Sequence, residues 1–251
     1  MKSFKLSIII LILTSGQLFA NSDSLCMRAI QLYEDEAYES ALESYREIIE
    51  SGYASPGLYY NMGNAAFRSN SIGLAVLYYE KTLKMDPTHR DAAHNLEYIS
   101  RYKVDAFEEV PVLFLRTWIN TAVHALPERT WSIMALSGFM LTLVFLLLYI
   151  FTHGLALKKT GFFLTMIGVL FTIFTLSSAL TTHHAIVQPD TGIILAPSVV
   201  VKSTPSETGT ELFILHEGSK VRVNEEVSGW HNIRIIDGRE GWIRTDDFGT
   251  I

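Results

Sequence analysis

The chain has 251 residues, a net charge of −6, and a composition that is 49% hydrophobic but only 18% charged. This balance is typical of a membrane protein with modest soluble parts. The acidic excess argues against nucleic-acid binding, which depends on clustered Lys and Arg, and the single cysteine, Cys26, excludes an intrachain disulfide.

The N-terminus has the pattern of a secretory signal peptide. Lys2 and Lys5 precede an apolar run at 6–13, and a small and polar stretch ends at Ala20. The apolar run is too short to cross a bilayer. We therefore expect residues 1–20 to be a cleaved signal peptide, with an uncleaved anchor as the alternative.

Residues 21–104 are predicted to be helical and repeat with a period of 34 residues. The matching pairs are Ala41 and Ala75, Tyr45 and Tyr79, Asn61 and Asn95, and Met62 and Leu96. This period, with these residue types, resembles the tetratricopeptide repeat. The resemblance implies an all-α tetratricopeptide array of two repeats plus a capping helix.

Four side chains are expected on the first helices of successive repeats, which line the concave groove in that family. They are Tyr60, Asn61, Asn64 and Asn95. The resemblance implies that the asparagines hydrogen-bond the backbone or terminus of a bound peptide. The alternative is that they bond to neighbouring helices. Tyr60 and Asp91 stand where a carboxylate clamp would have basic residues, so a C-terminal carboxylate is not the expected ligand.

Residues 105–130 are predicted to form an amphipathic juxtamembrane segment. From Pro111 onward, apolar residues such as Leu115, Trp118 and Ile119 recur at helical spacing. Two interpretations remain open. The helix lies in the outer headgroup layer with Trp118 buried, or it packs under the repeats.

Two charge-free apolar runs, 131–151 and 161–180, are 21 and 20 residues long. At ~1.5 Å of rise per residue, each helix would reach roughly 30 Å, about the thickness of the hydrocarbon core of a bilayer. The alternative is a pair of helices buried in a soluble core, but the length of both runs favours the membrane. The sequence therefore predicts a two-helix transmembrane hairpin.

The link at 152–160 contains Lys158 and Lys159 and no acidic residue, which places it in the cytoplasm by the positive-inside rule. The flanking regions 21–127 and 181–251 carry net charges of −6 and −4. We expect an inner-membrane protein with two spans, whose N- and C-terminal regions are both extracytoplasmic (periplasmic).

Residues 188–251 alternate between strand-like runs and turn signals. The six runs are 192–196, 199–203, 211–216, 220–224, 230–235 and 241–244. This region resembles a bacterial SH3 domain, through the Lys202 to Pro205 turn, Glu217-Gly218, Gly229-Trp230 and Gly241-Trp242. The resemblance implies an all-β SH3-like barrel. Trp230 and Trp242 either pack its core or present a flat face to a peptide or glycan strand.

Known catalytic and metal-binding motifs are absent from the sequence. The sequence has no phosphate-cradling Gly-rich loop, nucleophile elbow or zinc-binding helix, and its histidines lack ligand spacing. We therefore expect no catalytic residues, no metal site, no cofactor and no enzymatic activity.

The order of these parts resembles the BatE-like proteins of the Bacteroides aerotolerance (Bat) operons, along essentially the whole chain. The resemblance implies a complex with other envelope proteins, the Bat proteins that carry von Willebrand A domains. A MoxR-type AAA+ ATPase would act only indirectly, because the cytoplasmic link is too short for a specific interface. The resulting hypothesis is a non-enzymatic scaffold in contact with membrane lipid, and the alternative is a peptidoglycan-binding protein that recruits a cell-wall enzyme.

Overall fold

The computed structural model describes residues 24–101, 105, 114–187 and 190–251. The predicted signal peptide and residues 106–113 of the predicted juxtamembrane segment lie outside the described residues. The chain divides into two compact units. One combines the first helices with the C-terminal strands, and the other contains the two long apolar helices.

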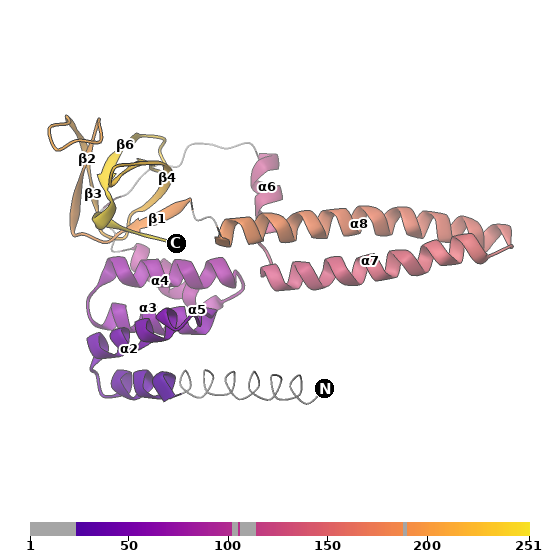
Figure 1. Ribbon diagram of the computed structural model, residues 1–251, viewed down its shortest axis with the longest axis horizontal. Helices are drawn as coiled ribbons and strands as arrows, with labels where there is room; N and C mark the ends of the chain where they lie inside the picture. The colour runs from indigo at the N-terminus through magenta and orange to yellow at the C-terminus, as the bar shows by residue number, and fades with distance from the viewer. Residues whose placement is uncertain (1–23, 102–104, 106–113, 188–189) are drawn as a thin grey trace, which may run out of the picture. The chain divides into compact units, whose positions relative to one another are not determined.

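The first unit begins with short helices joined by tight turns (Figure 1). They are the helix at 24–34, α2 (Tyr38–Glu50), α3 (Pro56–Arg68), α4 (Ile72–Met85) and α5 (Arg90–Ser100). The start of α3 follows from its sequence. The Ser55 side chain accepts a hydrogen bond from Leu58 N at 3.2 Å, and Pro56 occupies the first turn, where its missing N–H costs nothing.

Small residues let α3 and α4 approach closely. A Cβ built on Gly63 would lie 2.6 Å from Cε1 of Tyr79, so the Tyr79 ring rests directly on the α3 backbone. Tyr79 is only 1% exposed, and Ala41 and Ala75 are completely buried. The close crossing places the Tyr79 hydroxyl where side chains of neighbouring helices reach it.

The C-terminal strands form one seven-stranded antiparallel sheet in the order β3-β2-β6-β5-β4-β1-β7. The strands are β1 (Thr191–Ile194), β2 (Ser198–Lys202), β3 (Glu211–His216), β4 (Lys220–Val227), β5 (Trp230–Arg234), β6 (Glu240–Arg244) and β7 (Phe248–Thr250). Each of the six predicted runs forms a strand, and β7 was not predicted. The turn from β4 to β5 holds Ser228 at φ 51° and Gly229 at φ 81°, a left-handed pair typical of a tight hairpin.

The predicted fold class is wrong in two respects. There is no large all-α tetratricopeptide array, because the helices described at 24–101 are short and few and share a unit with the sheet. The two 34-residue periods are too few to build a longer stack of helices. The predicted SH3-like barrel is also not closed, because β3 and β7 remain at opposite edges of the sheet. The three-residue β7 pairs with β1, and β3 pairs with β2.

Direct contacts join the helices of this unit to its sheet. Gly73 N at the start of α4 donates to Glu217 Oε2 at 3.2 Å, and Lys220 Nζ lies 2.8 Å from Glu80 Oε2. A Cβ on Gly73 would lie 2.9 Å from the Ile194 carbonyl oxygen, so the backbones nearly touch. The two soluble regions predicted from the sequence therefore share an interface.

The second unit contains α6 (Phe114–Val123), α7 (Glu128–Phe151) and α8 (Leu155–Val187). The described residues include two helices long and apolar enough to cross a membrane, α7 and α8, which run side by side as a hairpin (Figure 1). Small residues line the seam between them. A Cβ on Gly138 would lie 2.9 Å from the Phe171 ring, and one on Gly161 would lie 3.0 Å from Tyr149 N.

The structure changes the ends of the hairpin. Because α8 begins at Leu155, the link between the helices is only 152–154, and Lys158 and Lys159 belong to the first turns of α8. In α6, Phe114, Trp118 and Ile119 are 73%, 74% and 54% exposed. Both interpretations of the juxtamembrane segment stay open.

Candidate functional site

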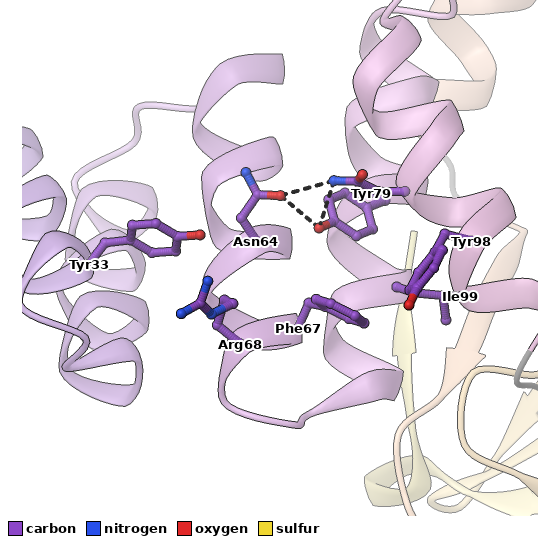
Figure 2. A pocket seen from close by; sticks show the side chains of 8 residues that line it. Tyr33, Asn64, Phe67, Arg68, Tyr79, Tyr98 and Ile99 are labelled. Atoms are coloured by element: carbon purple, nitrogen blue, oxygen red, sulfur yellow. Dashed lines mark hydrogen bonds between the residues drawn. The ribbon is translucent and has the colours of Figure 1, made fainter.

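Three side chains from successive helices form a hydrogen-bonded cluster (Figure 2). The Tyr79 hydroxyl on α4 donates to Asn64 Oδ1 on α3 at 2.7 Å. Asn95 Nδ2 on α5 lies 3.2 Å from Asn64 Oδ1 and 3.2 Å from the Tyr79 oxygen. We call Asn64, Tyr79 and Asn95 the amide cluster. It ties α3, α4 and α5 together at one point.

The Tyr79 hydroxyl is held in its protonated form. Burial raises the pKa of Tyr79 well above its ordinary value of 10.0, and the hydrogen bond from Asn95 opposes this only in part. The hydroxyl therefore keeps donating to Asn64 at all physiological pH values. This fixes the orientation of the Asn64 amide, since its oxygen must face the hydroxyl.

The amide cluster contains one donor group and one acceptor that are not used within the cluster. Within the described part of the chain, Asn64 Nδ2 and Asn95 Oδ1 make no hydrogen bond. They provide one donor and one acceptor from neighbouring helices. A polypeptide backbone offers the complementary pair, a carbonyl oxygen and an N–H, at every residue.

A small cavity of about 90 Å³ opens beside the amide cluster. The cavity has room for several water molecules or the tip of one side chain. Four of its eight lining residues are aromatic, and the ring centres of Phe67 and Tyr98 lie 6.1 Å apart in an edge-on arrangement. The lining residues are Tyr33, Asn64, Phe67, Arg68, Tyr79, Asn95, Tyr98 and Ile99.

Arg68 adds a positive charge at this cavity. Its guanidinium lies 4.9 Å from the centre of the Tyr38 ring and 3.9 Å from Glu36 Oε1. The side chains of Arg68 and Glu36 are both largely exposed, so their ion pair is weak. The Arg68 charge can therefore still interact with a bound ligand. Burial raises the pKa of Tyr33, while the Arg68 charge acts to lower it. The cavity is therefore aromatic, polar and weakly cationic.

The structure brings together only part of the predicted groove. Asn64 and Asn95 meet in the amide cluster, and the Tyr60 ring centre lies 6.0 Å from that of Tyr79. Asn61 lies on α3 outside the cavity lining and makes no side-chain hydrogen bond to the described residues. The bonds that Asn64 and Asn95 make are those of the alternative interpretation, between neighbouring helices.

Sequence reasoning missed Arg68 as a cavity residue and treated Tyr79 only as packing. A signal was present on α3. Tyr60, Asn64 and Arg68 are spaced by four residues each, which places them on one face of a helix. Arg68 lies one helical turn after Asn64 on this face, so the spacing predicts a positive charge beside the Asn64 amide.

Trp230 and Trp242 lie on the sheet face opposite its buried core. Trp242 pairs with Asn232, while the core residue Ile233 pairs with Gly241, so the tryptophans share the outer face. Both are half-buried, and Lys202 Nζ lies 5.9 Å from the centre of the Trp230 ring. This arrangement is a partly exposed aromatic surface with a neighbouring cation.

Among the described residues, no group of three or more His, Cys, Asp or Glu is arranged to hold a metal ion. No protein-family model and no curated protein matches the chain. The function must therefore be inferred from the residues themselves.

Proposed function

We propose that this chain is a membrane-anchored scaffold without enzymatic activity that binds an extended segment of an envelope protein at the amide cluster. The observation that carries the proposal is the free donor and acceptor on Asn64 and Asn95, held rigidly by the buried Tyr79 hydroxyl. The adjoining cavity accepts one side chain of the segment, and Arg68 favours an acidic one.

The proposed location is the inner membrane, with both soluble regions on its extracytoplasmic side. Contacts such as Lys220 to Glu80 need the residues before and after the hairpin to be on one side of the membrane. Two spans return the chain to that side. The two lysines at the start of α8 support a cytoplasmic position for the turn of the hairpin.

The proposed partners follow from the resemblance to BatE-like proteins. They are envelope proteins with von Willebrand A domains, and a MoxR-type ATPase is reached only through them. The three-residue link at 152–154 strengthens this argument, because a specific interface buries ~800 Å² on each side.

Co-purification from membranes tests the binding role. Asn95→Ala removes the free acceptor and both hydrogen bonds that Asn95 donates within the amide cluster, while Asn61→Ala removes a matched asparagine outside the cavity. We expect the Asn95 variant to lose envelope partners that the Asn61 variant retains. Circular dichroism and thermal unfolding of both variants check that the helices are intact.

Equal recovery of every partner by the folded Asn95→Ala chain would show that the amide cluster does not bind them.

Topology is tested separately, by adding protease to intact spheroplasts. Digestion of residues on both sides of the hairpin is expected. Protection of either region would contradict the proposed location.

The outer face of the sheet supports a second candidate function, peptidoglycan binding with recruitment of a cell-wall enzyme. Trp230, Trp242 and Asn232 lie together on that face, and partly exposed aromatic rings beside amides suit a glycan strand. Sedimentation with purified wall material tests it. Loss of sedimentation in a folded Trp230→Ala, Trp242→Ala chain, with retention in Asn95→Ala, would favour this function over peptide binding.

A further inference from the structure

A cleft of about 440 Å³ lies at the closed end of the α7 and α8 hairpin. Tyr149 comes from the last turn of α7, and the remaining lining residues come from the start of α8. The lining residues are Tyr149, Leu155, Lys158, Lys159, Phe162 and Phe163. All belong to the unit that contains the two apolar helices.

One wall of the cleft is apolar and exposed. Leu155, Phe162 and Phe163 are 79%, 49% and 56% exposed, although each is a large hydrophobic side chain. The Tyr149 and Phe162 ring centres are 5.9 Å apart, and those of Phe162 and Phe163 are 5.5 Å apart. This aromatic wall is a surface for hydrocarbon, since water would hydrate it poorly.

The charges in the cleft are uncompensated. Lys158 and Lys159 are the only charged residues between Arg129 and Asp190 in the sequence. Neither forms an ion pair with a residue that the structure describes, and Lys158 Nζ instead lies 5.5 Å from the centre of the Tyr149 ring. Two exposed ammonium groups beside an apolar wall are complementary to an anion that is itself attached to hydrocarbon.

We propose that this cleft binds one anionic phospholipid. Its phosphate lies between Lys158 and Lys159, and an acyl chain covers Phe162 and Phe163. The first N–H groups of α8 add a favourable partial positive charge, because α8 begins at Leu155. The shared chemistry is a phosphate anion, and the apolar wall selects the lipid over free phosphate. This site is independent of the proposed binding at the amide cluster.

Native mass spectrometry of the full chain in a neutral detergent tests the proposal. The probes are phosphatidylglycerol and phosphatidylcholine with identical acyl chains. We expect preferential retention of phosphatidylglycerol, with affinity falling about fivefold per lysine removed and about 25-fold in Lys158→Gln, Lys159→Gln, as expected for ~1 kcal/mol per lysine near an anionic lipid surface. Binding of phosphatidylcholine should not change.

Two further variants control for charge and folding. Arg129→Gln removes one cation from the other end of the hairpin and should retain wild-type lipid preference. Lys158→Arg, Lys159→Arg keeps both charges and should restore phosphatidylglycerol binding if the Gln variant is folded but defective. Circular dichroism follows the helices in each case.

Equal retention of the two lipids by the wild-type chain would overturn the proposal, as would unchanged phosphatidylglycerol binding in the double Gln variant. A third arm adds inorganic phosphate in large molar excess. Retention of the lipid supports an amphiphile site. Complete displacement of the lipid by phosphate would show a simple anion site and contradict the role of the apolar wall.

Discussion

The Asp105 carboxylate accepts a hydrogen bond from Ser219 Oγ at 2.6 Å, although 114 residues separate them in the chain. The same carboxylate accepts from His216 N at 2.8 Å and lies 2.8 Å from His216 Nδ1. His216 ends β3 and Ser219 precedes β4. Asp105 therefore fastens the segment after α5 to a turn of the sheet, with the whole hairpin of α7 and α8 lying between them in sequence.

Replacing Asp105 is expected to destabilise this unit mainly above pH 4. Burial acts to raise the pKa of Asp105, but the bonds from Ser219 and His216 outweigh it and hold the pKa below 3.8. The ionised form is therefore favoured by folding, so its stabilisation is present above pH 3.8 and lost as the pH falls through the lower folded value. Asp105→Asn should cost about 2 kcal/mol at neutral pH, as is typical of hydrogen bonds to a charged group.

Denaturant unfolding of the full chain in detergent, repeated across this pH range, measures the effect. Asp246→Asn removes an exposed carboxylate of the same unit and should change little. If Asp105→Asn and the wild type lose stability in parallel as the pH falls, the carboxylate does not fasten the two parts.

Features set by local sequence were predicted well. The charge-free runs identified both apolar helices, because ~20 consecutive apolar residues are long enough to form a helix that could cross a membrane. Alternating residues and turn signals identified six strands. The prediction failed at Phe248–Thr250, where three residues are too few to show alternation, and at Leu155, where ordinary helix-forming residues extend α8 beyond its apolar part.

Features set by distant pairing were not predicted. Whether a sheet closes depends on which edges meet, and nothing in the sequence of β3 shows that it stays at an edge. The Asp105 to Ser219 bond has no sequence signature for the same reason. The site was predicted in part, since the asparagines were named from the repeat, but their contact through Tyr79 depends on the crossing of α3 and α4.

That crossing makes Gly63 sensitive to substitution. In Gly63→Ala the new methyl carbon would lie 2.6 Å from the Tyr79 ring, which is itself buried and cannot move freely. We expect a loss of about 2 kcal/mol, as is typical of overpacking, and displacement of the hydroxyl from Asn64. Thermal unfolding measures the first effect, and partner recovery measures the second.

Gly57→Ala is the matched control on the same helix. A Cβ on Gly57 would have no neighbour within 4 Å. Alanine favours helix over glycine by up to ~1 kcal/mol, so this variant should be neutral or slightly more stable. Equal effects of the two substitutions on thermal unfolding would mean that the close contact between Gly63 and Tyr79 does not decide the outcome.

Tyr45 is expected to make the helices sensitive to alkali. Burial, together with the nearby Cys26 and Tyr33, raises the pKa of Tyr45 from 10.0 to about 12. A group whose pKa is raised by folding stabilises the chain below its unfolded value, and this stabilisation is lost as the pH rises from 10 to 12. Tyr45→Phe should therefore unfold less readily in alkali, while Tyr53→Phe, at an exposed position, should behave as the wild type.

The seam between α7 and α8 should not tolerate a larger residue at Gly168. A Cβ there would lie 3.3 Å from Cβ of Thr142, which is buried and whose hydroxyl donates to the Gly138 carbonyl oxygen at 2.7 Å. Gly168→Leu would force α7 and α8 apart, and we expect a loss of about 2 kcal/mol or more. Val169→Leu enlarges the next residue, which is 43% exposed, and should leave thermal unfolding in detergent unchanged. Equal melting temperatures for the two variants would show that close packing of α7 and α8 does not limit the stability of the hairpin.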